Sequence, residues 1–383
     1  MSQDCAARGG VKNVRGNGMT VSMRLRAAAP IMGVAALALI GLGGEALAQQ
    51  TLKVQTSQSA GDFTFQYMSE EWAPKVAAMS GGELKLELLP AGSVVPYRET
   101  IDAVANGILD GDLTATSYFS GRDPVFAMIG DLIAGYDTVD QVQGFCEHGG
   151  GKEILQKAMD EVTGGEIHVV GCGPYAKEAL VSTVPIRTVE DFEGIKIRSP
   201  EGLAAEVFRR AGASPVALPF SEVFTSLEKR IVDAADASAY VNNAQTGMHD
   251  IAKYPLYPGI HSMAVLHFSI NQDTWDGLTD AQRTILDVWY DAAYNDLRRY
   301  ADLKDQEMVQ KDRAGEGTKG IEVIDWPQEE RDKFRQIALG AWQDFAQQSG
   351  LAKEAYEAHV AYMMQIGLLS REEGQEALAG AEG

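Results

Sequence analysis

The chain has 383 residues, of which 45% are hydrophobic and 23% are charged. This composition is typical of a globular protein, and the length is sufficient for two ordinary domains. Lysine and arginine total 33 against 54 aspartate and glutamate residues, which gives a formal net charge of −21 at pH 7. An acidic surface of this size repels nucleic acid and anionic lipid, so we expect no nucleic-acid partner. Any site for an anion must therefore be locally basic.

The N-terminus has the pattern of a secretory signal peptide. Arg24 and Arg26 precede an apolar stretch over residues 27–42, and small residues follow at positions 46 and 48 in the arrangement of a cleavage site. We therefore assign residues 1–48 to a signal peptide with an N-terminal extension, and we expect a periplasmic protein. A retained membrane anchor is the weaker alternative, because the apolar stretch is barely long enough to cross a bilayer.

Strands and helices are predicted to alternate through the first part of the chain beyond residue 48. Apolar residues at every second position indicate strands, and apolar residues at helical spacing indicate helices. The predicted elements are a strand at 52–56, a helix at 63–79, a strand at 84–89, a helix at 98–106, a strand near 112–116 and a loop at 117–119. Such alternation favours an α/β fold with a mainly parallel sheet.

The same alternation continues toward the C-terminus and ends in helices. A capping-box pattern at Thr188 and Asp191 predicts a short helix that Gly194 ends. The elements predicted next are a strand at 195–198, a helix at 203–210, a strand at 215–218, a helix at 221–230, and strands at 231–235 and 264–271. Residues from Thr279 to about Lys311 include no glycine or proline, which predicts one unusually long helix.

The motifs of common enzymes are missing from the sequence. The run His148-Gly-Gly-Gly151 lacks the Gly-x-Ser-x-Gly elbow that an esterase needs, and we interpret it as a glycine-rich helix end. No phosphate-binding loop occurs, and the six histidines include no His-x-x-x-His pair, which makes a zinc site improbable. We therefore expect a protein that is not an enzyme, and a secreted hydrolase is the disfavoured alternative.

Two cysteines lie beyond the predicted cleavage site, Cys146 and Cys172. An oxidising compartment permits a disulfide between them. The sequence does not supply the short Cα separation that a bridge needs, so we favour two buried free thiols.

The segment Asp191-Phe-Glu-Gly-Ile-Lys-Ile-Arg198-Ser-Pro200 resembles the core motif of the solute receptors of tripartite ATP-independent periplasmic (TRAP) transporters, the DctP-like family. The segments 212–227 and 231–236 are similar to the parts of that family that follow. The resemblance covers about residues 51–345, and it implies a two-lobed α/β fold like that of periplasmic binding proteins, with the long helix spanning both lobes. The implied division is 49–174 with 262–300 for lobe I, and 175–261 with 301–383 for lobe II.

The resemblance also implies a binding site. In this family the arginine that ends the central strand, here Arg198, grips the carboxylate of the ligand, and a planar guanidinium suits that two-pronged contact. Tyr118 lies at the family's location for a tyrosine that lines the pocket. Phe65 and Tyr240 are further candidates for apolar walls, although ordinary core packing is an equal alternative for both.

The sequence is most similar to the branch of the family that binds 2-oxo monocarboxylates, sometimes with a metal ion. Counting back from Arg198 places Lys177 where that branch has a glutamine ligand, and Asp236 and Ser262 stand at further positions around the ion. We therefore hypothesise a site without metal or other cofactor, in which the Lys177 ammonium replaces the ion and pairs with Asp236. A lysine on the surface is the alternative.

The resemblance implies a periplasmic receptor that delivers a small organic acid anion, a 2-oxo or hydroxy monocarboxylate, to the membrane permease subunits of a TRAP transporter. A C4-dicarboxylate receptor, a sugar-acid receptor and an input receptor for a sensor kinase are the alternatives. An amphipathic segment at 354–369 leaves a monomer and a homodimer equally open.

Overall fold

The computed structural model describes residues 49–260 and 262–380. The predicted signal peptide at residues 1–48 lies outside the described residues and stays a prediction. Within the described part, no helix is long and apolar enough to cross a membrane.

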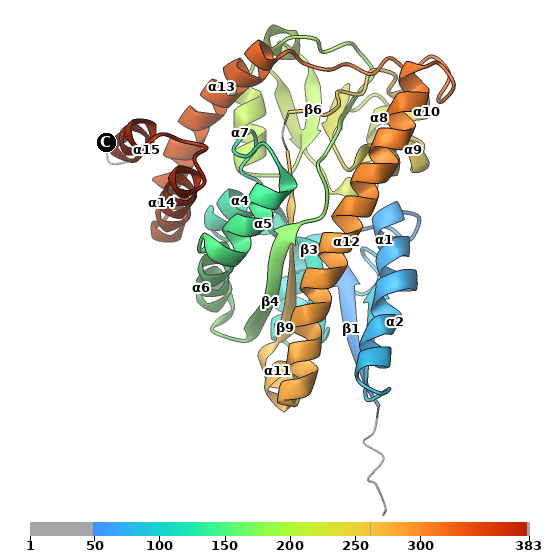
Figure 1. Cartoon of the computed structure of the whole chain (residues 1–383), viewed down its shortest axis with the longest axis vertical. Helices are drawn as coiled ribbons and strands as arrows, with labels where there is room; N and C mark the ends of the chain where they lie inside the picture. The colour runs from blue at the N-terminus through green and yellow to red at the C-terminus, as the bar shows by residue number, and fades with distance from the viewer. Residues whose placement is uncertain (1–48, 261, 381–383) are drawn as a thin grey trace, which may run out of the picture. The chain divides into compact units, whose positions relative to one another are not determined.

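Five strands form the first sheet, in the order β2-β1-β3-β9-β4 (Figure 1). Their bounds are β1 Gln50–Thr56, β2 Leu84–Leu89, β3 Gly111–Ala115, β4 Ile167–Pro174 and β9 Val265–Asn271. Strand β1 pairs in parallel with β2 and β3, whereas β9 is antiparallel to both β3 and β4. Four of the five strands therefore run in the same direction, as expected for a mainly parallel sheet, and β9 runs opposite to the two strands between which it lies.

Four short strands form the second sheet, in the order β5-β8-β6-β7. Their bounds are β5 Leu180–Ser182, β6 Lys196–Ser199, β7 Ser214–Ala217 and β8 Ala234–Asp236. Strand β6 is parallel to its neighbours β7 and β8, and β5 is antiparallel to β8. Arg198 therefore lies near the carboxyl end of a central parallel strand, which is the end of an α/β sheet at which ligands usually bind.

Helices before the long helix pack along the two sheets. Their bounds are α1 Phe63–Tyr67, α2 Ala73–Met79, α3 Thr100–Ala105, α4 Val125–Gly130, α5 Val139–His148, α6 Gly151–Thr163, α7 Leu203–Arg210, α8 Val223–Glu228, α9 Tyr240–Gln245, α10 Met248–Ile251 and α11 Gln272–Gly277. The helix predicted at 63–79 is one helical run with a π-helical stretch at Met68–Trp72 between α1 and α2. The short helix predicted after Thr188 is a 3-10 turn over Val189–Phe192, with the expected capping box.

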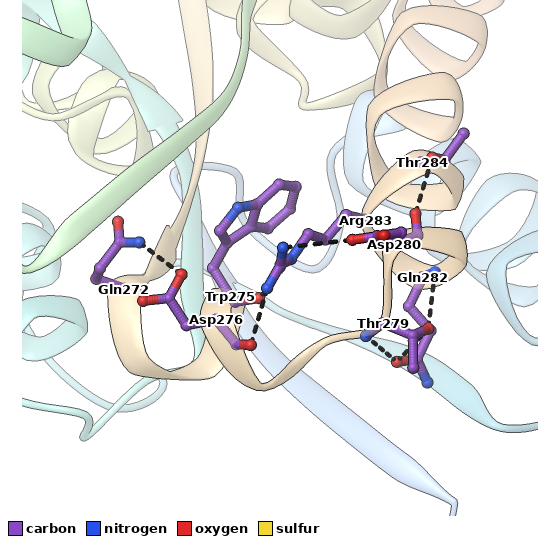
Figure 2. A network of polar contacts seen from close by, with 8 residues as sticks. All are labelled: Gln272, Trp275, Asp276, Thr279, Asp280, Gln282, Arg283 and Thr284. Atoms are coloured by element: carbon purple, nitrogen blue, oxygen red, sulfur yellow. Dashed lines mark hydrogen bonds and ion pairs between the residues drawn. The ribbon is translucent and has the colours of Figure 1, made fainter.

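The predicted long helix is confirmed as α12, Asp280–Arg313, with 34 residues. Its first turn is fixed by a capping box in which the Gln282 backbone N–H donates to the Thr279 hydroxyl. Figure 2 shows how Arg283 ties this end of α12 to α11, because its guanidinium donates to the carbonyls of Trp275 and Asp276. Helix α12 then packs against β4 and α2 next to the first sheet, and against α9 next to the second sheet (Figure 1).

Three C-terminal helices complete the fold: α13 Gln328–Ala346, α14 Gly350–Gln365 and α15 Arg371–Gly380. Helix α13 packs on α7, which covers the second sheet, whereas α14 packs on α4 and α6, which cover the first. The strands of the first sheet come from residues 50–174 and 265–271, and those of the second from 180–236. Because the C-terminal helices contact both parts, the assignment of residues 301–383 to lobe II stays a prediction.

Cys146 on α5 and Cys172 on β4 form a disulfide, with their Cα atoms 5.7 Å apart. The preference for two free thiols is therefore wrong. The two residues are 26 positions apart in the sequence, and the packing of α5 on β4 is what brings them within bridging distance.

Candidate functional site

Arg198 is a buried cation that neutral acceptors hold in place. Its side chain lies at the end of β6, and the residue is 3% exposed. Its Nε donates to the Leu218 carbonyl at 2.8 Å, its Nη1 to the Asp236 carbonyl at 2.5 Å, and its Nη2 lies 3.5 Å from the Tyr118 hydroxyl. Within residues 49–260 and 262–380, no carboxylate forms an ion pair with it. A buried charge without an opposite partner is costly, so this guanidinium is suited to an anionic ligand.

Tyr118 lies beside this guanidinium and links the two sheets. It belongs to the 3-10 turn Thr116–Phe119 that follows β3, and it is buried. Its hydroxyl accepts a hydrogen bond from the Phe220 backbone N–H at 3.1 Å and lies within reach of Arg198. The ring of Tyr97 packs edge-on against its ring at 4.8 Å. The structure thus brings Tyr118 and Arg198 together, and their role in binding stays a prediction.

A small cavity lies next to Arg198. Its volume is about 30 Å³. The lining residues come from both sheets and their loops: Ser57, Gln58, Ala115, Ser117, Tyr118, Tyr175, Glu178, Arg198, Pro200, Phe220, Ala237, Ser238, Ala264 and Leu266.

Three buried carboxyl groups gather on one side of this cavity. Asp131 follows α4, Glu178 follows β4 and Asp236 ends β8, and one carboxylate oxygen of each lies within 4.8 Å of the others. The hydroxyl of Ser262 lies among them, 2.6 Å from Asp131 Oδ2, 3.0 Å from Glu178 Oε2 and 3.4 Å from Asp236 Oδ2. Glu178 also lines the cavity, so this acidic cluster adjoins the space next to Arg198.

Burial raises the pKa of all three groups. It raises the pKa of Asp131 to about 6, and burial together with the charge of Asp131 raises the pKa of Glu178 to about 7. Burial and the two neighbouring carboxyls raise the pKa of Asp236 well above its usual range. The positive charge of Arg198 opposes this increase for the pKa of Glu178 and of Asp236. The protonation of Glu178 and Asp236 therefore depends on the positive charge of Arg198.

Lys177 does not take the place that we expected for it. Its ammonium donates to the Asp137 carbonyl at 3.2 Å, and the neighbouring residue Glu178 presents its side chain to the cavity instead. The predicted pairing of Lys177 with Asp236 is therefore wrong. Glu178 and not Lys177 lines the cavity, as expected where successive side chains point in different directions.

Tyr240 and Phe65 lie outside the lining of this cavity. Tyr240 is fully buried under α12, where its hydroxyl donates to Asp312 Oδ2 at 2.6 Å, so the core alternative holds for it. Phe65 on α1 lines an adjacent cavity that shares Gln58 and Leu266 with the first. Asp236 is not among the residues that line the Arg198 cavity, and it contacts the arginine through its carbonyl oxygen.

Sequence reasoning missed Asp131, Tyr175 and Glu178. Asp131 is far from any recognised motif, so nothing in the sequence marks it. Glu178 could have been found as the acidic neighbour of Lys177, and Tyr175 donates its hydroxyl hydrogen to Glu178 Oε1. Ser262, at a position where an acid was expected, does contact the cluster.

The sequence matches a known protein family and curated proteins. The family model of the bacterial extracellular solute-binding proteins, family 7 (DctP), matches residues 54–349. A monocarboxylate 2-oxoacid-binding periplasmic protein of Nostoc is 26% identical over 305 residues, which cover 78% of this chain and 80% of that protein. A 2,3-diketo-L-gulonate-binding periplasmic protein of Escherichia coli is 26% identical over 314 residues, which cover 79% of this chain and 88% of that protein.

Solved structures agree with this match. A TRAP periplasmic solute-binding protein from Rhodobacter sphaeroides, in an open form without ligand, is 40% identical, with a TM-score of 0.68 and coverage of 84% of this chain and 100% of that chain. A second one, from Pseudoalteromonas atlantica with bound sodium and pyruvate, has a TM-score of 0.72 at 22% identity. It covers 86% of this chain and 99% of that chain, and at this identity it supports the fold alone.

Proposed function

Since the chain belongs to the bacterial extracellular solute-binding proteins, family 7, we propose that it binds a small monocarboxylate through the guanidinium of Arg198. The family consists of receptors that bind small organic anions and work with a membrane permease. The finer proposal is a periplasmic receptor, released by cleavage of a signal peptide, whose ligand is a 2-oxo or hydroxy acid.

The observation that carries the proposal is that no carboxylate of the described residues forms an ion pair with the buried guanidinium of Arg198. Two backbone carbonyls and a tyrosine hydroxyl fix the plane of the guanidinium, so little side-chain freedom is lost when a carboxylate binds. A carboxylate facing this plane accepts charge-assisted hydrogen bonds, which are stronger than bonds between neutral groups. Exclusion of water from so buried a place strengthens the attraction further.

The cavity favours one carboxylate over two. Among the described residues that line it, Arg198 is the one basic side chain, and Glu178 is acidic. A second carboxylate would therefore face an acid, which makes a dicarboxylate the weaker alternative. The names of two relatives agree with a carboxylate ligand, since one is described as binding 2-oxoacids and the other 2,3-diketo-L-gulonate.

Binding requires an opening motion. The Tyr118 hydroxyl belongs to a loop of the first sheet, and its partners Phe220 and Arg198 belong to the second. These contacts close the space next to the arginine, so we infer that they break when a ligand enters and form again around it. With a hinge motion of this kind, a bound ligand stabilises the closed form.

Titration calorimetry with pyruvate, L-lactate and a dicarboxylate such as succinate tests the proposal. Arg198→Ala should weaken monocarboxylate binding by about 2–5 kcal/mol, or roughly 30-fold to several thousand-fold, the range for removing one partner of a buried charge pair. Lys177→Met is the matched control, because it removes a cation that bonds to Asp137 outside the cavity lining, and we expect nearly unchanged affinity. Unchanged affinity in Arg198→Ala, with folding retained, would refute the assignment.

A further inference from the structure

Ser117 has a buried hydroxyl group without a hydrogen-bond partner at the Arg198 cavity. The residue belongs to the 3-10 turn Thr116–Phe119, one position before Tyr118, and it is 3% exposed. It lines the same cavity as Arg198, and its Oγ has no partner among the described residues. A buried hydroxyl that forms no hydrogen bond is costly, and most buried polar groups in proteins are paired. This hydroxyl is therefore suited to a polar atom of a ligand.

The turn that contains Ser117 does not use this hydroxyl. A serine or threonine hydroxyl in a helical segment often donates to a backbone carbonyl three or four positions earlier. Thr163 donates to the Met159 carbonyl in this way at 2.7 Å, and Thr246 donates to the Asn242 carbonyl at 2.8 Å. Ser117 forms no such bond within the described part of the chain, so its hydrogen is available to a group in the cavity.

Two other hydroxyl groups of the lining have partners in the protein. Tyr175 donates to Glu178 Oε1 and lies 3.2 Å from Ser238 Oγ. Ser238 Oγ also accepts from the Asn242 side-chain amide at 3.0 Å. Four further residues of the lining have apolar side chains: Ala115, Ala237, Ala264 and Leu266. Ser117 therefore differs from these residues in having a buried hydroxyl hydrogen that no acceptor of the described residues takes.

Gly130 fixes the position of Ser117. It ends α4, and a Cβ atom added to it would lie 2.4 Å from the Ser117 backbone nitrogen and 2.9 Å from the Ser117 Cβ. A residue with a side chain therefore does not fit there unless Ser117 moves. The close packing of α4 on the turn holds Ser117 next to Tyr118, whose hydroxyl lies 3.5 Å from Arg198 Nη2.

We propose that Ser117 selects the ligand by donating a hydrogen bond to an oxygen on the carbon next to the carboxylate, which is the keto oxygen of a 2-oxo acid or the hydroxyl of a 2-hydroxy acid. The inference rests on the carboxylate site proposed above for Arg198. Both residues border one small cavity, so the part of the ligand closest to its carboxylate faces Ser117. An acid without this oxygen leaves the hydroxyl unpaired, and a site with a buried hydrogen-bonding group discriminates against such an analogue.

A cation is the alternative means of recognising the same oxygen. Asp131, Glu178 and Asp236 each offer a carboxylate oxygen, and these oxygens lie within 4.8 Å of one another. Calcium binds oxygens of this kind, so this donor set fits such an ion. An ion held there would also attract an oxygen of the ligand. Selection by Ser117 does not require the ion, so the two alternatives predict different results in the presence of a chelator.

Titration calorimetry with pyruvate, L-lactate and propionate, in buffer that contains EDTA, tests the proposal. Ser117→Ala should weaken the binding of pyruvate and L-lactate by about twofold to tenfold, the range for one hydrogen bond between neutral groups. Propionate has no oxygen to accept this bond, so its affinity should change by less than about twofold. The preference for pyruvate over propionate should therefore fall in this variant.

Thr114→Val is the matched control. The Thr114 hydroxyl is also buried and has no partner within the described residues, but Thr114 does not line the Arg198 cavity. This variant should keep the preference of the wild type for pyruvate. The melting temperature of the free protein reports on folding, and it should be unchanged or raised in both variants, because each removes an unpaired buried hydroxyl.

Three results separate the possible failures. A preference for pyruvate that Ser117→Ala leaves unchanged, including an equal loss of affinity for pyruvate and propionate, would overturn the role of Ser117. A wild-type preference that is lost in EDTA and restored by calcium would also overturn it, because an ion would then recognise the oxygen. Wild-type protein that binds none of the three acids, with or without calcium, would instead refute the function proposed for Arg198.

Discussion

Tyr118→Phe removes one oxygen atom that bridges the two sheets beside the proposed anion site. That oxygen accepts from the Phe220 N–H at 3.1 Å and lies 3.5 Å from Arg198 Nη2. A hydrogen bond between neutral groups contributes about 0.5–1.5 kcal/mol, and a buried donor left unpaired costs about 1–3 kcal/mol. The contact with Arg198 is long and adds little. We therefore expect a loss of about 1–2 kcal/mol in ligand binding, which is about fivefold to 30-fold in Kd.

Stopped-flow measurement of ligand release is the direct assay for this change. Because the bridge belongs to the closed form, its loss should appear mainly as faster dissociation, with a small effect on association. Tyr97→Phe is the matched control. It removes a hydroxyl from the ring packed against Tyr118 and leaves the bridge to Phe220 intact. A dissociation rate that is unchanged in Tyr118→Phe, or equally raised in Tyr97→Phe, would contradict the reasoning.

Two further predictions concern stability. Replacing Cys146 and Cys172 together by alanine opens a loop closed over a separation of 26 residues, which should lower the free energy of unfolding by about 3.5 kcal/mol on the chain-entropy model. Denaturant titration measures this, and a loss below about 1 kcal/mol would show that the bridge adds little. Burial raises the pKa of Asp305 from 3.8 to about 8. The neutral carboxyl therefore stabilises the fold fully below about pH 4, and this stabilisation is lost as pH rises through 8. The free energy of unfolding should fall by at most about 1.4 kcal/mol per pH unit over this range. Asp305→Asn should flatten the fall in melting temperature between pH 6 and 8, and an identical slope in the variant and the wild type would refute this assignment.

Local sequence signals predicted the elements that carry the site. The segment without glycine or proline after Thr279 predicted α12, and Thr279 is the N-cap of that helix in the structure. The strand predicted at 195–198 is observed as β6, Lys196–Ser199. Each of these features depends on residues close together in the sequence, which is why the sequence was sufficient.

Features that depend on long-range packing were not predicted. The antiparallel insertion of β9 between β3 and β4 and the bridge from Cys146 to Cys172 both join distant segments. The acidic cluster has the same origin, since Asp131 reaches Ser262 across a separation of 131 residues. The sequence alone does not indicate which of the neighbours Lys177 and Glu178 faces the cavity, and in the structure it is Glu178.

A crystal structure of the protein with a bound monocarboxylate is the most direct test of the central claim about Arg198. The account predicts that Nη1 and Nη2 of Arg198 both lie about 2.7–2.9 Å from the two carboxylate oxygens, the usual range for charge-assisted bonds. A carboxylate bound without contact to Arg198, or Arg198 paired with a carboxylate of the chain itself, would contradict it.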